Sequence, residues 1–152
     1  MNNSNYLKFA IMMAMSFVIM YAVMYFNVDT FEHIYLAKTR TYMTLLMIAT
    51  MAITMLLFMW KMYSNKKLNY LILAISLLIG GSTYHFLRQQ TFVDDVAWMR
   101  AMIPHHSSAI MVSQKANLSD PEAQELAQDI IEAQKREIAK MKKMIDRLTE
   151  KQ

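Results

Sequence analysis

Two adjacent histidines follow a proline in residues 99–111, MRAMIPHHSSAIM, and methionines stand on both sides of them. Imidazole with thioether is a soft to borderline ligand set, which suits Cu(I), or Cu(II) when more imidazole and carboxylate are present, better than Mg²⁺ or Ca²⁺. The same stretch could instead be a kinked piece of core, with packed thioethers and hydrogen-bonded histidines. Spacing alone leaves these two interpretations about even.

Helical spacing gathers several of these groups on one face. Each residue of an α-helix advances by about 100°. With Asp95 placed at zero, Met99 falls at ~40°, Met102 at ~340° and His106 at ~20°. These four side chains therefore share one face over three turns, and all of them can bind a metal ion or a proton. His105 falls at ~280°, on the margin of this face.

A proline in the middle of this helix should change its course. Pro104 cannot donate to the carbonyl of Arg100, so we expect a kink that turns both imidazoles towards one point. From a second helix further along the chain, Gln134 and Met141, with Glu137 at the margin, would face the same pocket. The predicted metal ligands are His105, His106, Met102, Met99, Met141, Asp95 and Glu137.

The composition indicates an all-α protein that is half membrane-embedded. Of its 152 residues 55% are hydrophobic, with 17 Met, no Cys, two Gly and two Pro, and so few helix breakers favour helices throughout. Without cysteine there is no disulfide framework, no zinc-finger pattern and no thiol nucleophile. Runs at 9–26, 42–60 and 70–87 contain no Asp, Glu, Lys or Arg, and each approaches the ~20 residues that cross a bilayer.

The distribution of charge predicts the orientation of these spans. The loop after the second span contains Lys61, Lys66 and Lys67 and no acid, so the positive-inside bias places it in the cytoplasm. The amino terminus is then inside, and residues 88–152 lie outside together with all four histidines, His33 and His85 included. The basic excess belongs to residues 1–87, because residues 88–152 carry ten Lys/Arg and ten Asp/Glu, and this argues against nucleic-acid binding.

Residues 88–152 are predicted to form a two-helix hairpin domain beside a membrane domain of residues 1–87. The first helix begins at Thr91, as the first residue of a Thr-x-x-Asp capping pattern, and runs to about 117. NLSDPE supplies a cap and Pro121 for a second helix at 121–148. Two such helices cannot bury both apolar stripes alone, so we expect either packing on the spans or a homodimer that completes a four-helix bundle.

The hairpin resembles domain-of-unknown-function family 305, whose helical bundles are grouped with ferritin-like folds. The family pattern is Asp-x-x-aromatic-x-x-x-Met-Ile-Pro-His-His followed by Ala-Ile, and then Ile-Ile-x-x-Gln-x-x-Glu-Ile-x-x-Met in a second helix. Residues that match it are Asp95, Trp98, Met102, Ile103, Pro104, His105, His106, Ala109, Ile110, Ile130, Ile131, Gln134, Glu137, Ile138 and Met141. The resemblance covers residues 91–148 and leaves out the three spans.

The resemblance implies copper binding and copper resistance in the bacterial periplasm, with Met102, His105, His106 and Met141 as ligands. Two positions depart from the family pattern: Ser107 replaces a glutamine and Val112 replaces a methionine, so one thioether is absent. The expected function is a copper-binding protein anchored in the bacterial cytoplasmic membrane, which stores, buffers or hands copper to a transfer partner. The alternative is a non-catalytic interaction module in which the hairpin mediates oligomerisation.

Catalysis is not expected. A di-metal oxidase of the ferritin-like type needs paired Glu-x-x-His motifs, and no Glu-x-x-His occurs in the sequence. Ser107 and Ser108 stand beside the histidines only in sequence, which does not make a nucleophile, base and orienting group.

Overall fold

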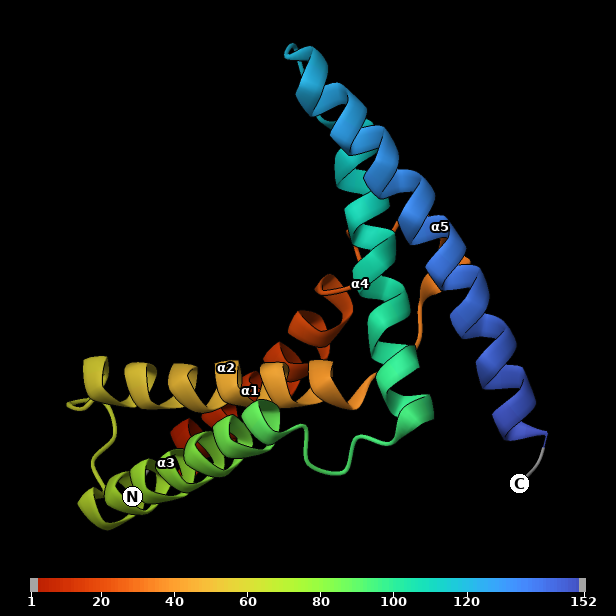
Figure 1. The fold of residues 1–152 in the computed structure, drawn as a ribbon. Helices are drawn as coiled ribbons and strands as arrows, with labels where there is room; N and C mark the ends of the chain where they lie inside the picture. The colour runs from red at the N-terminus through yellow and green to blue at the C-terminus, as the bar shows by residue number, and fades with distance from the viewer. Residues whose placement is uncertain (1–2, 151–152) are drawn as a thin grey trace. The chain divides into compact units, whose positions relative to one another are not determined.

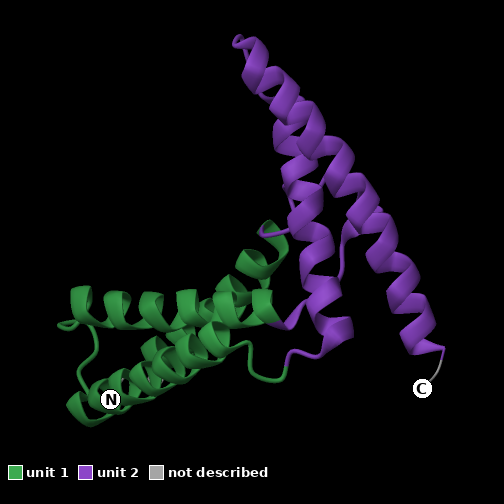
Figure 2. Cartoon of the chain, viewed as in Figure 1, with its two compact units in different colours: residues 1–23, 39–92 green, residues 24–38, 93–152 purple. Residues whose placement is uncertain are grey.

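The computed structural model describes residues 3–150, and within that range it contains five α-helices, one short 3-10 helix and no strand (Figure 1). The prediction of an all-α protein is confirmed. The chain forms two compact units, coloured separately in Figure 2. The first unit holds the chain up to Val23 together with Thr39–Phe92, and the second holds Met24–Lys38 and the chain from Val93 onwards.

Three helices of the first unit are long and apolar enough to cross a membrane. They are α1 (Asn3–Val23), α2 (Lys38–Phe58) and α3 (Lys66–Gln89). Each coincides with one predicted span, but α1 ends three residues before the predicted boundary at 26. Large apolar side chains such as Val18, Leu57 and Leu78 point outwards. This pattern suits helices whose solvent is lipid, because lipid imposes no cost on exposed apolar side chains.

Polar contacts close one end of this unit. The Tyr6 hydroxyl donates to Oδ1 of Asn69 at 2.8 Å, and Nδ2 of Asn69 donates to the carbonyl oxygen of Tyr63 at 2.9 Å. The side chain of Asn65 caps α3 by accepting from the amide of Leu68. Asn69 is fully buried, so both halves of its amide are satisfied where water cannot reach. These bonds bring the start of α1 to the start of α3.

The other end joins the start of α2 to the end of α3. The Tyr42 hydroxyl donates to the carbonyl oxygen of Thr91 at 2.8 Å, and Thr39 bonds the side chain of Gln90. Gln90 ends α3 in a left-handed conformation with φ 50°. α2 is therefore antiparallel to α3, whereas α1 runs parallel to α3. It follows that the segment after α1 and the segment after α3 leave the first unit by the same end.

The helix that carries the histidines begins later than predicted. α4 (Asp95–Lys115) is capped by Asp94, whose carboxylate accepts from the amide of Ala97 at 2.7 Å. Thr91 does not start it, because the amide of Thr91 instead bonds the carbonyl of Phe86 and closes α3. The predicted start at Thr91 is thus wrong by four residues. Beyond Pro104, α4 continues as α-helix to Lys115.

The second helix of the hairpin agrees with the sequence prediction. α5 (Pro121–Thr149) has Asp120 as its N-cap and Pro121 in the first turn. α4 and α5 pack against each other along one apolar seam (Figure 1). The buried core of the seam consists of Met99, Ile103, Ile110, Ile131, Ile138, Met141 and Ile145.

Residues 24–38, which we call the strap, cover a second side of α4. The strap includes the 3-10 helix η1 (Phe31–His33). The Ser107 hydroxyl is fully buried, accepts from the amide of Asp29 at 2.8 Å and lies 2.9 Å from Nδ1 of His33. Asn27 donates to Ser108 at 2.7 Å, and Tyr35 packs on the core. The sequence division at residue 87 had placed these residues with the membrane domain.

The polar cluster at Asn69 yields the first prediction. Asn69→Leu removes the acceptor at 2.8 Å from the Tyr6 hydroxyl and the side-chain donor to the Tyr63 carbonyl, so we expect a loss of about 1–3 kcal/mol of unfolding free energy. Thermal denaturation in detergent, followed by circular dichroism, measures it. Asn27→Ala, which removes an exposed hydrogen bond, serves as the control. Equal melting temperatures for the two variants would show that this cluster contributes no more to stability than the exposed hydrogen bond does.

The strap yields a prediction about pH. Burial, and after it the charge of Lys142, lowers the pKa of His33, against smaller opposing effects of Asp29 and Glu32. The unfolded imidazole titrates near pH ~6.5. The folded chain therefore binds fewer protons in the window below that value, and its stability falls as pH drops through it. Neutral His33 also accepts the Ser107 proton, which a protonated ring cannot do.

His33→Gln keeps an acceptor for Ser107 and removes the titration. We expect the drop in melting temperature between pH 8 and pH 5 to be smaller in this variant than in the unmodified protein. Identical drops in the two proteins would show that His33 does not link the strap to pH.

Candidate functional site

One predicted pair of site residues meets across the hairpin. Nε2 of His106 on α4 lies 2.6 Å from Oε2 of Glu137 on α5. The His106 side chain is 12% exposed, whereas Glu137 is 56% exposed and keeps contact with solvent. A carboxylate at this distance accepts the Nε2 proton of the imidazole, and this bond fixes both the tautomer and the orientation of the ring.

The second ring nitrogen of His106 is buried without a partner. Nδ1 has no hydrogen-bond partner among the described residues, and the same is true of Oε1 of Gln134 on α5. When Nε2 carries the proton, Nδ1 presents a lone pair. A histidine that donates one nitrogen to a carboxylate and keeps the other free is the usual arrangement of a metal-ligating imidazole.

The methionines of the predicted site lie in or beside the core. Met102 precedes His106 by one helical turn and packs at the edge of the core, partly buried. Met141 follows Glu137 by one turn on α5 and is buried. Thioethers in such positions can either fill space or supply soft donors, since methionine is flexible and polarizable.

His105 does not join His106. It is exposed, and the two rings have centroids 6.3 Å apart at 67°. Because α4 remains helical through Pro104, consecutive residues stay about 100° apart around the axis. The expected kink, which would have turned both imidazoles to one point, does not bring them together.

Two further predicted ligands lie too far along α4. Asp95 is exposed and precedes His106 by eleven residues, about 16 Å of helix. Met99 precedes it by seven residues, about 10 Å, and is buried in the core. Two ligands of one metal ion must have donor atoms within about 5 Å of each other, given metal–ligand bonds of about 2.3 Å. Neither residue shares a coordination sphere with His106.

Over residues 3–150, no group of three or more His, Asp or Glu side chains is arranged to hold a metal ion. A site at His106 would therefore depend on thioethers beside a single imidazole. Such a donor set excludes hard ions such as Mg²⁺ and Ca²⁺, which require oxygen ligands.

Sequence reasoning missed the role of Ser107. It appeared only as a departure from the family pattern, whereas the structure uses its hydroxyl to hold the strap. A signal was present, because Ser107 lies about 100° from His106 around the helix and so faces away from it. Ser107 is a polar residue in the middle of α4, but nothing in the sequence identified the strap as its partner.

Comparison with known proteins gives a relative of nearly the same length. The chain is 35% identical over 149 residues to "Uncharacterized protein L153" of Acanthamoeba polyphaga mimivirus, which covers 96% of this chain and 94% of that protein. The similarity thus extends over the three apolar helices as well as the hairpin.

No solved structure matches the chain. Residues 85–145, from the end of α3 to the last turns of α5, match the family described as Domain of unknown function (DUF305). Together with the similarity along the whole viral relative, this match shows that the chain belongs to the DUF305 family.

Proposed function

We propose that this protein is a membrane-anchored metal-binding protein that holds copper, as Cu(I), at His106. The observation that carries the proposal is the buried, unpartnered Nδ1 of His106, whose ring is oriented through Nε2 by Glu137. The resemblance of the MIPHH and QxxEIxxM motifs to a copper-associated family supports the same metal.

In this proposal His106 is the imidazole ligand, and Met102 and Met141 supply thioethers. The two methionines lie one turn from His106 and one turn from Glu137, so each can reach the seam between α4 and α5. Thioether donors favour Cu(I) over the harder divalent ions. Glu137 is a positioning residue rather than a ligand, because His106 already occupies its Oε2.

The membrane spans give this site its location. The lysines between α2 and α3 favour that loop as cytoplasmic, which puts the amino terminus inside and the hairpin on the outer face of a bacterial cytoplasmic membrane. A binding site tethered there could buffer copper or hand it to a transfer partner. Retention of metal with slow exchange would indicate storage, and fast exchange would indicate transfer.

A second function has support from exposed apolar side chains of the hairpin. Trp98 and Val112 on α4 are 50% and 55% exposed, and Leu126 on α5 is 60% exposed. Trp98 and Val112 lie two heptads apart, so they share a side of α4, about 180° from Ser107 and the strap. We propose that a second copy packs on this side and completes a four-helix bundle.

The copper proposal predicts different effects on Cu(I) binding for substitutions of the two histidines. His106→Ala should lower Cu(I) affinity by more than the roughly 10–100-fold that loss of an orienting partner costs, and Glu137→Gln should fall within that range. His105→Ala, the matched control, should bind as the unmodified protein does, because its ring is exposed and separate. Competition against a chromophoric Cu(I) chelator, with the full chain in detergent, measures the affinities.

Met102→Leu tests the thioether at nearly constant volume, so it should weaken Cu(I) binding while leaving helicity unchanged. Equal losses in His105→Ala and His106→Ala, or unchanged binding in His106→Ala, would rule out a site at His106. Circular dichroism of each variant distinguishes lost ligation from lost folding.

The pairing of two copies is tested by light scattering in detergent. We expect a dimer for the unmodified protein, and a larger monomer fraction for the double variant Trp98→Gln/Val112→Gln, since it removes apolar area from the proposed interface. Phe31→Gln removes an even more exposed side chain from the strap and should leave the dimer intact. A strictly monomeric unmodified protein would exclude the four-helix bundle.

A further inference from the structure

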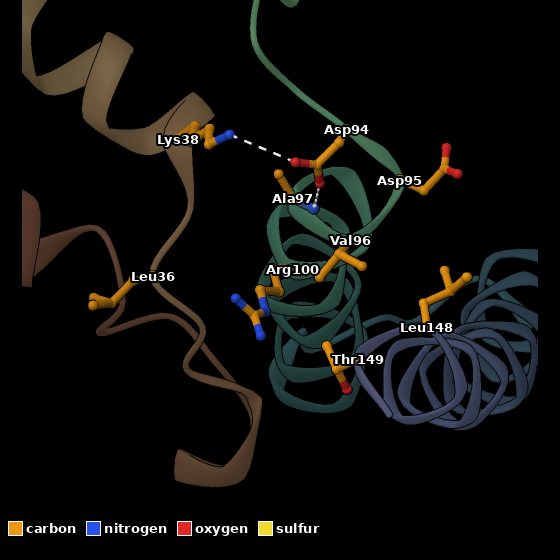
Figure 3. Close-up of a pocket in the computed structure, with 9 residues that line it drawn as sticks. All are labelled: Leu36, Lys38, Asp94, Asp95, Val96, Ala97, Arg100, Leu148 and Thr149. Atoms are coloured by element: carbon orange, nitrogen blue, oxygen red, sulfur yellow. Dashed lines mark hydrogen bonds and ion pairs between the residues drawn. The ribbon is translucent and has the colours of Figure 1, made fainter. Parts of the chain in front are cut away.

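A pocket of about 480 Å³ lies within the second unit, away from His106. Three segments line it: the end of the strap, the start of α4 and the last turn of α5 (Figure 3). Its polar lining comes mainly from Lys38, Asp94, Asp95 and Arg100, and Leu36 and Leu148 supply apolar walls. None of the residues that line this pocket is a ligand in the proposed copper site.

Two cations, Lys38 and Arg100, and two carboxylates, Asp94 and Asp95, line the pocket, and of these four groups only Lys38 and Asp94 form an ion pair. Lys38 and Asp94 form an ion pair at 3.7 Å, and Asp94 is also held as the N-cap of α4. The amide of Ala97 is the main cause of the lowered pKa of Asp94, so this carboxyl stays ionised beside Lys38. In the described part of the chain Arg100 has no ion pair and no side-chain hydrogen bond, and its guanidinium points into the space towards the strap (Figure 3). Asp95 points away from it (Figure 3).

Chain connectivity places this pocket at the membrane boundary. Lys38 is the first residue of α2, and Asp94 follows the last residue of α3 by five positions. The ends of apolar spans coincide with the polar headgroup region of a bilayer. With α2 and α3 spanning a bilayer, two lining residues of the pocket, Lys38 and Asp94, would stand within five residues of the span ends.

The apolar surroundings of the pocket also suit a lipid. Leu36 lies two residues before α2 and is 77% exposed. Apolar side chains beside a cation can contact the acyl and glycerol parts of a lipid while the cation binds its phosphate. A free inorganic anion has no apolar part that could contact them.

We propose that this pocket binds the phosphodiester of a membrane phospholipid, with Arg100 as its principal cation. A guanidinium presents parallel N–H groups that match two phosphate oxygens, and among the described residues Arg100 has no ion-pair partner that would compete for them. The bound lipid would fasten the strap, the start of α4 and the end of α5 to the leaflet. The proposal is independent of copper, since none of the pocket residues is a proposed metal ligand.

Native mass spectrometry of the full chain, released from detergent with added lipid, tests the proposal. We expect phosphatidylglycerol to be retained and diacylglycerol, which lacks phosphate, to be lost. Arg100→Gln should weaken phosphatidylglycerol binding about tenfold, as expected for loss of a charge-assisted hydrogen bond. Arg100→Lys, which keeps the charge without the planar fork, should recover part of the binding.

Arg147→Gln is the matched control, because Arg147 is exposed near the same end of α5 but does not line the pocket. It should bind lipid as the unmodified protein does. An equal loss of lipid binding in Arg147→Gln would show that diffuse electrostatic attraction, and not the pocket, holds the lipid. Equal retention of diacylglycerol would overturn the phosphate assignment, and displacement of the lipid by millimolar inorganic phosphate would identify the ligand as a free anion.

Discussion

The second unit depends on the buried hydroxyl of Ser107. This one group accepts from the amide of Asp29 and can donate to Nδ1 of His33, so it binds the strap at two points where water is absent. The surface of α4 therefore has three different environments. One side packs on α5, one lies under the strap, and the third carries Trp98 and Val112 in contact with solvent.

This division explains why two adjacent histidines have different environments. Successive side chains on a continuous helix diverge by about 100°, so one imidazole can face α5 while its neighbour faces solvent. Glu137 then acts on His106 alone, and among the described residues Nδ1 of His106 is a buried nitrogen without a hydrogen-bond partner. The proposed function combines this one imidazole with sulfur, and that donor set is the physical basis of its preference for Cu(I).

Short connections join the hairpin to the three candidate membrane helices. The strap contains 15 residues, and the segment between α3 and α4 only five, Gln90 to Asp94. Because both leave the first unit by the same end, the strap and α4 begin within a few residues of that end of the candidate spans. The proposed lipid pocket and the proposed copper site would then belong to one surface-bound module, with the lipid contact at its base and the metal about two to three helical turns further along α4.

Features that depend on residues close together in the sequence could be predicted from the sequence alone. Uncharged apolar runs predicted three long apolar helices, and the NLSDPE segment with Pro121 predicted the start of α5. These features depend on residues a few positions apart, so sequence alone determines them. The start of α4, the separation of His105 from His106 and the burial of Ser107 under the strap were decided by tertiary structure. Each depends on a contact between segments that are tens of residues apart, such as Asp29 with Ser107, and helical periodicity carries no information about which distant segment will cover a given side.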